Sequence, residues 1–456
     1  MCGINLLFDD DEHTMNWMIA RMGQRGTRHT IRSYFKDRLW LGHMRLPIQG
    51  LGEEWDHPLS LGKWDGAMVG ELFNFKELEP TAQSDLPVAL KYWDALGTGS
   101  LDLFDGFWAI VFIDRSAGTV YVITDPLAKK PLYYRKHPRT MISSEIWPLT
   151  LDESTPDPIY RSAVMKWGYC PDERTPFSEI LKVPPGMILE IRHDGTVEKA
   201  YRYESKHLRP TAVDEISNPL YNLMKDAVKN RLVSDVPVSL LLSGGLDSSI
   251  LYKLTEKITR NFTVFHVENS EEEYLNDLKI PGDVRVERIE SESISLSEAI
   301  DANQTPVDLG SVIPQMALGR AIQKKGFNVA LSGDGADELF GGYRRAMDYD
   351  SQMSDVFHEL VYYHLPRLDT LMMASTVELR CPYLSWPVIR KAMTIPWRQR
   401  RSKEFLKAAF ADLIPKRILE RKKKPLRISG YDENRLGWRM RCMEEFDKIL
   451  ERRRLK

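Results

Sequence analysis

The strongest constraint on the fold is a glycine-rich turn that joins a strand pattern to a helix pattern. An apolar run, Val236 to Leu242, leads into Ser243-Gly244-Gly245-Leu246-Asp247-Ser248-Ser249, after which apolar residues recur at helical spacing up to Ile258. A strand, a glycine loop and a helix present backbone N–H groups and a helix N-terminus to a phosphate. The loop has no lysine, so it is not the common P-loop. It predicts that a nucleotide is consumed here, with serine hydroxyls as donors and Asp247 as a Mg²⁺ ligand.

Length and composition set the broad class. A chain of 456 residues favours two domains. Its net charge of −2 gives no excess of positive charge that would indicate a nucleic-acid-binding surface. No apolar run in the sequence is long enough to span a membrane. The four cysteines, at positions 2, 170, 381 and 442, have neither disulfide-framework nor zinc spacing. We therefore expect a cytoplasmic protein with reduced thiols and without a signal peptide.

The pattern of residues changes near residue 205. Before it the chain is rich in strands, at 39–46, 108–113, 119–123 and 187–191, with a hairpin turn at 114–118. After it, a helical stripe from Leu220 to Leu232 precedes strand patterns at 236–242, 262–267 and 327–331 that alternate with helices. Such alternation predicts a parallel sheet covered by helices. We place the two domains at 1–205 and 206–456.

A second loop follows the strand pattern at 327–331. It reads Ser332-Gly333-Asp334-Gly335-Ala336-Asp337-Glu338 and continues to Tyr343, with three carboxylates in five residues. Loops at the carboxyl ends of parallel strands are where such sheets bind ligands. Like charges this close repel unless a cation joins them. Alone, the segment could be an acidic helix N-terminus stabilised by the helix dipole; beside the first loop, we interpret it as metal-binding.

The start of the chain holds a third signal. Cys2 directly follows Met1, and removal of that methionine would leave a cysteine with a free α-amino group, whose ordinary pKa is about 7.7–8.0. Such a group is a usable general base for its own thiol. A cysteine at position 2 has no function in most chains, so this interpretation depends on the residues downstream.

Together these motifs resemble the glutamine-dependent asparagine synthetases over nearly the whole chain. The first half resembles a class II glutamine amidotransferase, which implies an N-terminal-nucleophile αββα sandwich. The second resembles the synthetase domain of the PP-loop, or adenine nucleotide α-hydrolase-like, class, which implies an α/β domain with a parallel sheet. The sequence of the loop at 243–249 is found in several ATP pyrophosphatases. The segments at 331–343 and 373–384 are more specific to the asparagine synthetases.

The resemblance implies roles in the first half. Cys2 matches the nucleophile that attacks glutamine, and Arg45 matches the residue that binds the glutamine α-carboxylate, for which a guanidinium fork is suited. Gly70 matches the oxyanion donor of the backbone. Glu71 and Asp85 match further glutamine-binding positions, Asp85 as the acceptor of the α-ammonium.

One position departs from the family. Val69 stands where the family has an asparagine whose side chain donates to the tetrahedral oxyanion. Loss of one such donor costs on the order of 10²–10³ in rate. We therefore expect slow glutamine hydrolysis, or another donor in its place.

In the second half, the resemblance implies ATP as the nucleotide and Mg²⁺ as its cation. Asp247 and Asp337 match the metal ligands, Asp334 matches an acid that assists proton transfer at the ammonia step, and Lys403 matches the lysine that stabilises charge on the leaving pyrophosphate. The ATP-binding positions are Leu242, Ser243, Gly244, Gly245, Asp247, Ser248, Ser249, Val267, Ser332 and Gly333.

The segment expected to bind the carboxylic acid substrate is the part of the chain that matches the family least. Between residues 305 and 314 Ser311 matches an acceptor-binding position but the acidic residues are shifted, and Ser385 replaces a common aspartate. The resemblance implies amidation of a carboxylic acid, most simply aspartate to asparagine, with ammonia from glutamine and release of AMP and pyrophosphate. The resemblance is also compatible with a homodimer. The alternatives are the same chemistry on another carboxylate, with weak or altered glutaminase activity, and a non-catalytic regulatory binding protein derived from this fold.

Overall fold

The computed structural model describes residues 2–23, 25–151, 154–203, 205, 219–267, 272–289, 294–308, 310–343, 357–421 and 434–454. Within them the first half of the chain forms two six-stranded antiparallel sheets. The first has the order β10-β8-β9-β1-β3-β2 and the second the order β12-β11-β7-β6-β5-β4. The strands are β1 (Gly3–Leu7), β2 (Arg28–Tyr34), β3 (Leu39–Arg45), β4 (Leu59–Leu61), β5 (Trp64–Leu72), β6 (Gly106–Asp114), β7 (Thr119–Thr124), β8 (Tyr133–Arg135), β9 (Met141–Ser143), β10 (Ile180–Lys182), β11 (Met187–Arg192) and β12 (Val197–Arg202).

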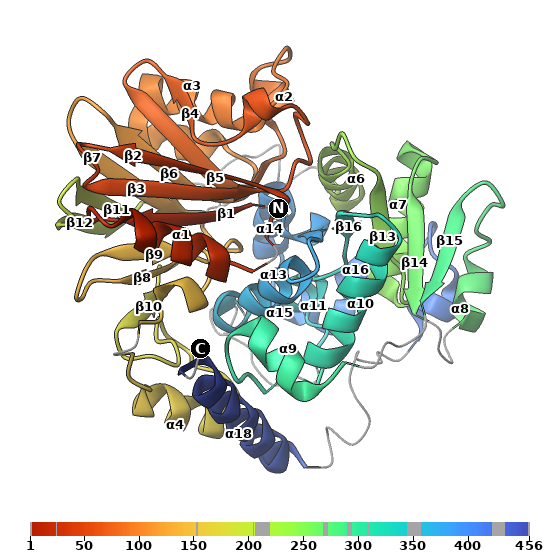
Figure 1. The fold of residues 1–456 in the computed structure, drawn as a ribbon. Helices are drawn as coiled ribbons and strands as arrows, with labels where there is room; N and C mark the ends of the chain where they lie inside the picture. The colour runs from red at the N-terminus through yellow and green to blue at the C-terminus, as the bar shows by residue number, and fades with distance from the viewer. Residues whose placement is uncertain are drawn as a thin grey trace.

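Helices cover the outer faces of these sheets. Helix α1 (Glu12–Arg21) packs on β1 and β3 of the first sheet, and α3 (Asp85–Leu96) packs on β4 and β5 of the second. The inner faces meet in one apolar cluster that includes Ile4, Leu41, Val69 and Val111. The predicted αββα sandwich is thus confirmed, and Figure 1 shows its layers in red to yellow-green. Two further helices of this half are α2 (Phe75–Leu78) and α4 (Pro158–Trp167).

The second half is built on a five-stranded sheet whose strand pairs are all parallel, in the order β15-β14-β13-β16-β17. Its strands are β13 (Val238–Leu241), β14 (Thr263–Val267), β15 (Arg285–Ile289), β16 (Val329–Leu331) and β17 (Glu378–Arg380). The described helices are α6 (Leu220–Arg231), α7 (Leu246–Ile258), α8 (Glu272–Asp277), α9 (Leu296–Asn303), α10 (Val312–Lys324), α11 (Ala336–Phe340), α13 (Leu365–Met373), α14 (Trp386–Thr394), α15 (Trp397–Arg400), α16 (Glu404–Ala409), α17 (Lys416–Leu419) and α18 (Arg435–Arg454). This confirms the predicted parallel α/β domain.

Most predicted elements are present, whereas two strands of the parallel sheet gave no signal. The expected hairpin at 108–123 is the β6–β7 pair, and the helical stripe from Leu220 is α6. Strand β17 was missed because it has three residues, two of them charged, so no apolar run marks it. Strand β15 alternates charged and apolar residues at the sheet edge, a weak pattern for a parallel strand.

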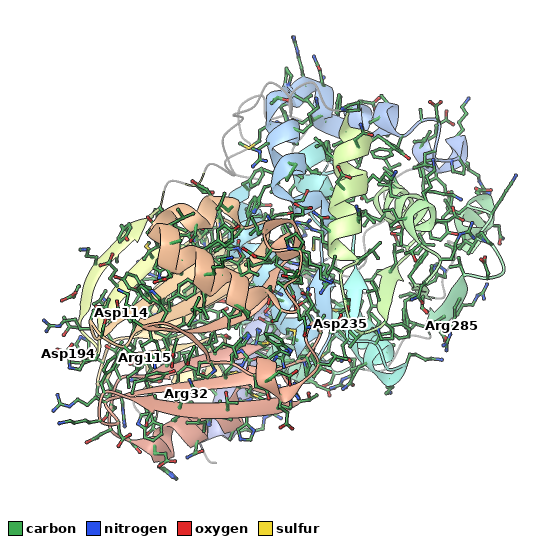
Figure 2. The ribbon with its side chains drawn as sticks, turned by 90° about the horizontal axis from the view of Figure 1, so that it is seen from above. Arg32, Asp114, Arg115, Asp194, Asp235 and Arg285 are labelled. Carbon is green, nitrogen blue, oxygen red and sulfur yellow. The ribbon has the colours of Figure 1, made fainter. Side chains whose placement is uncertain are left out.

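The described parts of the two halves contact each other at several places. Asp235, which Figure 2 labels where the halves meet, accepts a hydrogen bond from the Gly50 backbone N–H at 2.7 Å. At the other end, α18 packs against both α4 and α9 (Figure 1). The division at residue 205 stays a prediction: β12 ends at Arg202 and α6 begins at Leu220, and residues 206–218 lie outside the described part. Among the described helices, none combines the length and hydropathy needed to cross a bilayer.

Candidate active sites

The first candidate site lies at the start of β1. Cys2 is 8% exposed, and burial raises the pKa of its thiol to about 11. Its carbonyl accepts a weak hydrogen bond, at 3.5 Å, from the buried Arg25. Because the thiol is protonated at neutral pH, it needs a base to act as a nucleophile. The predicted base depends on removal of Met1, which lies outside the described residues.

Arg45, at the end of β3, binds the loop that follows it. Its guanidinium donates to Asp56 Oδ1 at 2.8 Å and to the carbonyl oxygens of Gln49, Gly50 and Gly52 at 2.9, 2.5 and 3.0 Å. The side chain is buried, so these acceptors satisfy it inside the fold. A substrate carboxylate would have to replace some of these acceptors.

Acidic side chains gather on the other side of this site. Asp85 begins α3, accepts from the Leu72 N–H at 2.9 Å, and has its pKa raised to about 6 by burial. The pKa of Glu71 is raised well above its usual range, by burial first and then by Glu378 and Asp85. Glu378 comes from β17 of the second half and pairs with Arg380 at 2.6 Å. Because burial and mutual repulsion both disfavour the charge of Glu71 and Asp85, these two acids suit a cationic ligand such as an ammonium.

Gly70 and Val69 lie in β5, directly before Glu71. Gly70 has φ +106°, and a Cβ there would lie 1.8 Å from the Phe107 carbonyl oxygen, so only glycine fits. Val69 is fully buried in the cluster that also contains Cys2. A valine side chain has no hydrogen-bond donor, so residue 69 cannot stabilise an oxyanion through its side chain.

The second candidate site lies where β13 and β16 end side by side in the parallel sheet. Gly244 takes φ +73° and Gly245 caps α7, while the Ser243 and Ser248 hydroxyls lie 3.1 Å apart. A Cβ on Gly333 of the second loop would lie 3.1 Å from the Asp247 Cβ. The two glycine-rich loops therefore touch, as their places on neighbouring strands require.

Lys403 joins the two loops. Its Nζ lies 2.5 Å from Asp247 Oδ2 and 2.6 Å from Asp337 Oδ1, and it is 8% exposed. Burial opposes its charge, but Asp247 and then Asp337 outweigh that effect, so the pKa of Lys403 is raised. Ser402 and Lys403 both have positive φ, +58° and +60°. This left-handed backbone conformation is energetically costly for residues other than glycine. Its presence at two successive residues indicates that the surrounding structure holds this lysine in place.

The residues here fit a cation bound together with a phosphate ligand. Mg²⁺ is usually held by one or two carboxylates with phosphate oxygens and water as the other ligands, and Asp247 and Asp337 supply two carboxylates. Among the described residues, no group of three or more His, Cys, Asp or Glu would form a metal cage by itself. The pair therefore fits a metal that arrives with a nucleotide.

The remaining predicted residues lie around these loops. Leu242 donates from its N–H to the Phe265 carbonyl at 2.9 Å, and Val267 ends the neighbouring strand β14. The Ser332 hydroxyl donates to Asp334 Oδ2 within the second loop. Ser249 is buried in the first turn of α7. Ser311 lies further along, at the N-terminus of α10.

Two groups of charged residues at these sites were missed in the sequence. Glu378 and Arg380 reach the first site from the second half, and the buried Arg367 of α13 donates to Ser311 Oγ at 2.8 Å. No local pattern could reveal them, because each acts on residues tens to hundreds of positions away.

A sandwich whose first strand directly follows Cys2, joined to a parallel sheet with two touching phosphate-type loops, defines a two-part enzyme class that pairs an amidotransferase with ATP-dependent synthesis. Comparison with known proteins supports this assignment to a two-part enzyme class. The glutamine amidotransferase domain family matches residues 1–202, and the asparagine synthase family matches residues 220–360 and 350–448. The chain belongs to the asparagine synthase family.

Its relatives are distant. The chain is 27% identical over 394 residues to a putative glutamine-hydrolyzing asparagine synthetase 2 of Methanocaldococcus jannaschii, covering 75% of this chain and 76% of that protein. It is 25% identical to asparagine synthetase B of Escherichia coli, covering 78% and 68%. The amidase chry2 of Gibberella zeae is 24% identical, covering 66% and 51%.

Proposed function

We propose that this protein makes an amide from a carboxylic acid, ATP and glutamine, and that the simplest acceptor is aspartate, giving asparagine. The observation that carries the proposal is Lys403, which bridges Asp247 and Asp337 where the two loops meet. A buried ammonium between two carboxylates, beside a helix N-terminus, suits the triphosphate of a nucleotide.

The synthetase half would activate the acid. A carboxylate oxygen of the acid attacks the α-phosphorus of ATP, the bond to the β-phosphate oxygen breaks, and pyrophosphate leaves as the acyl-adenylate forms. The loop at 243–249 would bind the phosphates through its N–H and hydroxyl groups, and Lys403 would stabilise the charge that develops on the leaving pyrophosphate. Asp247 and Asp337 would hold Mg²⁺, which when bound neutralises phosphate charge. Activation is needed because a carboxylate is a poor acceptor for an amine.

The amidotransferase half would supply ammonia. Once Met1 is removed, Cys2 Sγ attacks the glutamine carboxamide and its proton passes to the free α-amino group. That proton is then given to the departing nitrogen, the C–N bond breaks, and ammonia leaves as a thioester forms; water then releases glutamate. Glu71 and Asp85 would bind the glutamine ammonium, and Gly70 N–H the oxyanion. Ammonia then passes inside the protein to the adenylate, where it displaces AMP and Asp334 assists the proton transfer. We place this activity in the cytoplasm and allow for a homodimer.

A second candidate keeps this chemistry and changes the acid. It is favoured by Val69, whose buried aliphatic side chain cannot donate to an oxyanion, and by the similarity to a relative named as an amidase. An enzyme with altered glutamine hydrolysis and a different pocket around Ser311 would be a specialised amidating enzyme.

One experiment tests both candidates. The protein is incubated with ATP, Mg²⁺ and single carboxylic acids, and pyrophosphate exchange into ATP is measured; ammonium or glutamine is then added and the amide is identified by mass. Exchange with aspartate supports the first candidate, and exchange only with another acid supports the second. Failure with every acid would leave the non-catalytic binding protein. Cys2→Ala is the matched control, because it should lose the glutamine-dependent amide and keep the ammonium-dependent one.

A further inference from the structure

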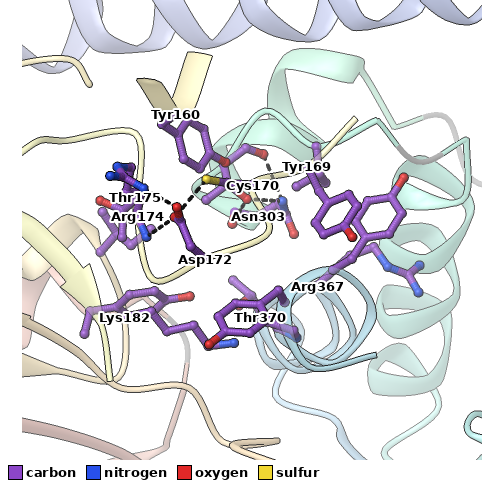
Figure 3. A pocket seen from close by; sticks show the side chains of 17 residues that line it. Tyr160, Tyr169, Cys170, Asp172, Arg174, Thr175, Lys182, Asn303, Arg367 and Thr370 are labelled. Atoms are coloured by element: carbon purple, nitrogen blue, oxygen red, sulfur yellow. Dashed lines mark hydrogen bonds and ion pairs between the residues drawn. The ribbon is translucent and has the colours of Figure 1, made fainter. Parts of the chain in front are cut away.

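Arg367 of α13 is a buried cation without a carboxylate partner among the described residues. It is 8% exposed, and its Nη1 donates to Ser311 Oγ at 2.8 Å and to Gln315 Oε1. Both partners are neutral, and its Nε has no hydrogen-bond partner. Figure 3 shows the side chain leaving α13 with its guanidinium directed away from Cys170 and Asp172 of the neighbouring pocket.

Such a charge is costly to keep inside a protein. A guanidinium does not lose its proton in proteins, so it must be compensated by other means. Burial lowers the pKa of Arg367, and the strongest opposing charge is Asp334 of the second loop, which does not form an ion pair with it. An incoming anion would supply the missing partner, and a planar fork with an open Nε is suited to a carboxylate.

The surroundings of Arg367 also favour an anion. Ser311 is the N-cap of α10, a helix of 13 residues, and its side chain makes no capping hydrogen bond to the first turn. The positive end of the helix and its first N–H groups thus face the same place as the guanidinium. Asp334 of the second loop is near enough to act electrostatically on Arg367, so this place adjoins the synthetase loops.

We propose that Arg367, together with Ser311 and the first turn of α10, binds a second carboxylate of the acceptor acid, the one that is not activated. This inference rests on the proposed function and names its substrate class: a dicarboxylic acid, with or without an amino group. Anchoring one carboxylate here fixes which other carboxylate reaches the α-phosphate of ATP. Arg367 is therefore a specificity residue of the acceptor site.

The test compares Arg367→Gln and Arg367→Lys with the wild-type protein. The control is Arg320→Gln on α10, which removes the same charge from a partly exposed pair with Glu298. Binding of aspartate, succinate and 3-aminopropionate, which lacks the second carboxylate, is measured by calorimetry without turnover. Pyrophosphate release with the same acids, and the KM for ATP, are measured separately.

We expect the wild type and Arg320→Gln to bind aspartate and succinate more tightly than 3-aminopropionate. Arg367→Gln should weaken diacid binding on the order of 10- to 100-fold and leave 3-aminopropionate and the KM for ATP unchanged. Arg367→Lys should fall between, because it keeps the charge and loses the fork.

Equal binding of the three acids by the wild type, or diacid binding that Arg367→Gln does not weaken, would overturn the inference. Diacid binding that depends on Arg367 without any pyrophosphate release would instead refute the proposed function and leave the anion site standing.

Discussion

Replacing Val69 by Asn tests whether glutamine hydrolysis is limited by a missing oxyanion donor. Val69 is fully buried in β5 and shares an apolar cluster with Cys2, so a side-chain amide there would lie inside the amidotransferase core. If it reaches the oxyanion, the gain should be the usual worth of one such donor, on the order of 10²–10³ in kcat.

The same change has a cost that can be measured independently. It removes a buried valine, worth about 1.5–3 kcal/mol when fully buried, and adds a polar group that costs about 1–3 kcal/mol if it finds no partner. We therefore expect Val69→Asn to lower the free energy of unfolding by about 2–4 kcal/mol and to raise glutaminase activity. Val69→Ala is the matched control, since it shortens the same side chain and adds no donor.

The assay is glutamate release from glutamine, with unfolding followed by denaturant in parallel. A folded Val69→Asn protein that hydrolyses glutamine at the wild-type rate would refute the reasoning and show that another donor has replaced the asparagine. A similar gain in Val69→Ala would show that space, and not hydrogen bonding, limits the rate.

Three further predictions concern single charges. Arg439→Met should lower the free energy of unfolding by about 3 kcal/mol, because Arg439 of α18 pairs at 2.6 Å with the buried Asp308. The control is the more exposed pair of Arg161 on α4 with Asp447 on α18, for which Arg161→Met should cost under about 1 kcal/mol by denaturant unfolding. The KM for glutamine should rise as the pH falls through about 6, because protonation of Asp85, whose pKa is raised to about 6, removes the charge that would attract the substrate ammonium; Asp85→Asn should raise that KM at all pH values and remove the part of its pH dependence that lies near 6, leaving the part due to Glu71. Lys403→Met should lower the rate of pyrophosphate exchange by at least about 10²-fold while glutamate release persists; equal loss of both activities would mean that the variant is misfolded.

The sequence shows its strongest elements because their signals are local. The glycine loop at 243–249, the strand before it and the helical stripe from Leu220 each depend on neighbours within one or two turns. Strand β17 could not be found in this way, because a three-residue strand with two charged residues is stabilised by its pairing with β16 and by burial, and not by its own pattern.

The candidate sites likewise contain residues that local sequence motifs reveal and residues that only tertiary contacts bring to the site. The two-part architecture could be predicted from sequence patterns and motifs alone, and Cys2, Asp247, Asp337 and Lys403 were predicted as site residues because each lies in a motif or near a recognisable one. That Lys403 bridges both aspartates follows from the tertiary structure, because neighbouring strands β13 and β16 bring Asp247 and Asp337 together and Lys403 comes from a distant turn between α15 and α16.

Tertiary structure likewise placed Glu378 against the amidotransferase site and buried Arg367 beside Ser311 without a carboxylate partner. The physical reason is that burial and the electrostatic environment of a charge depend on every element packed around it. Those neighbours cannot be predicted from residue type and spacing along the chain.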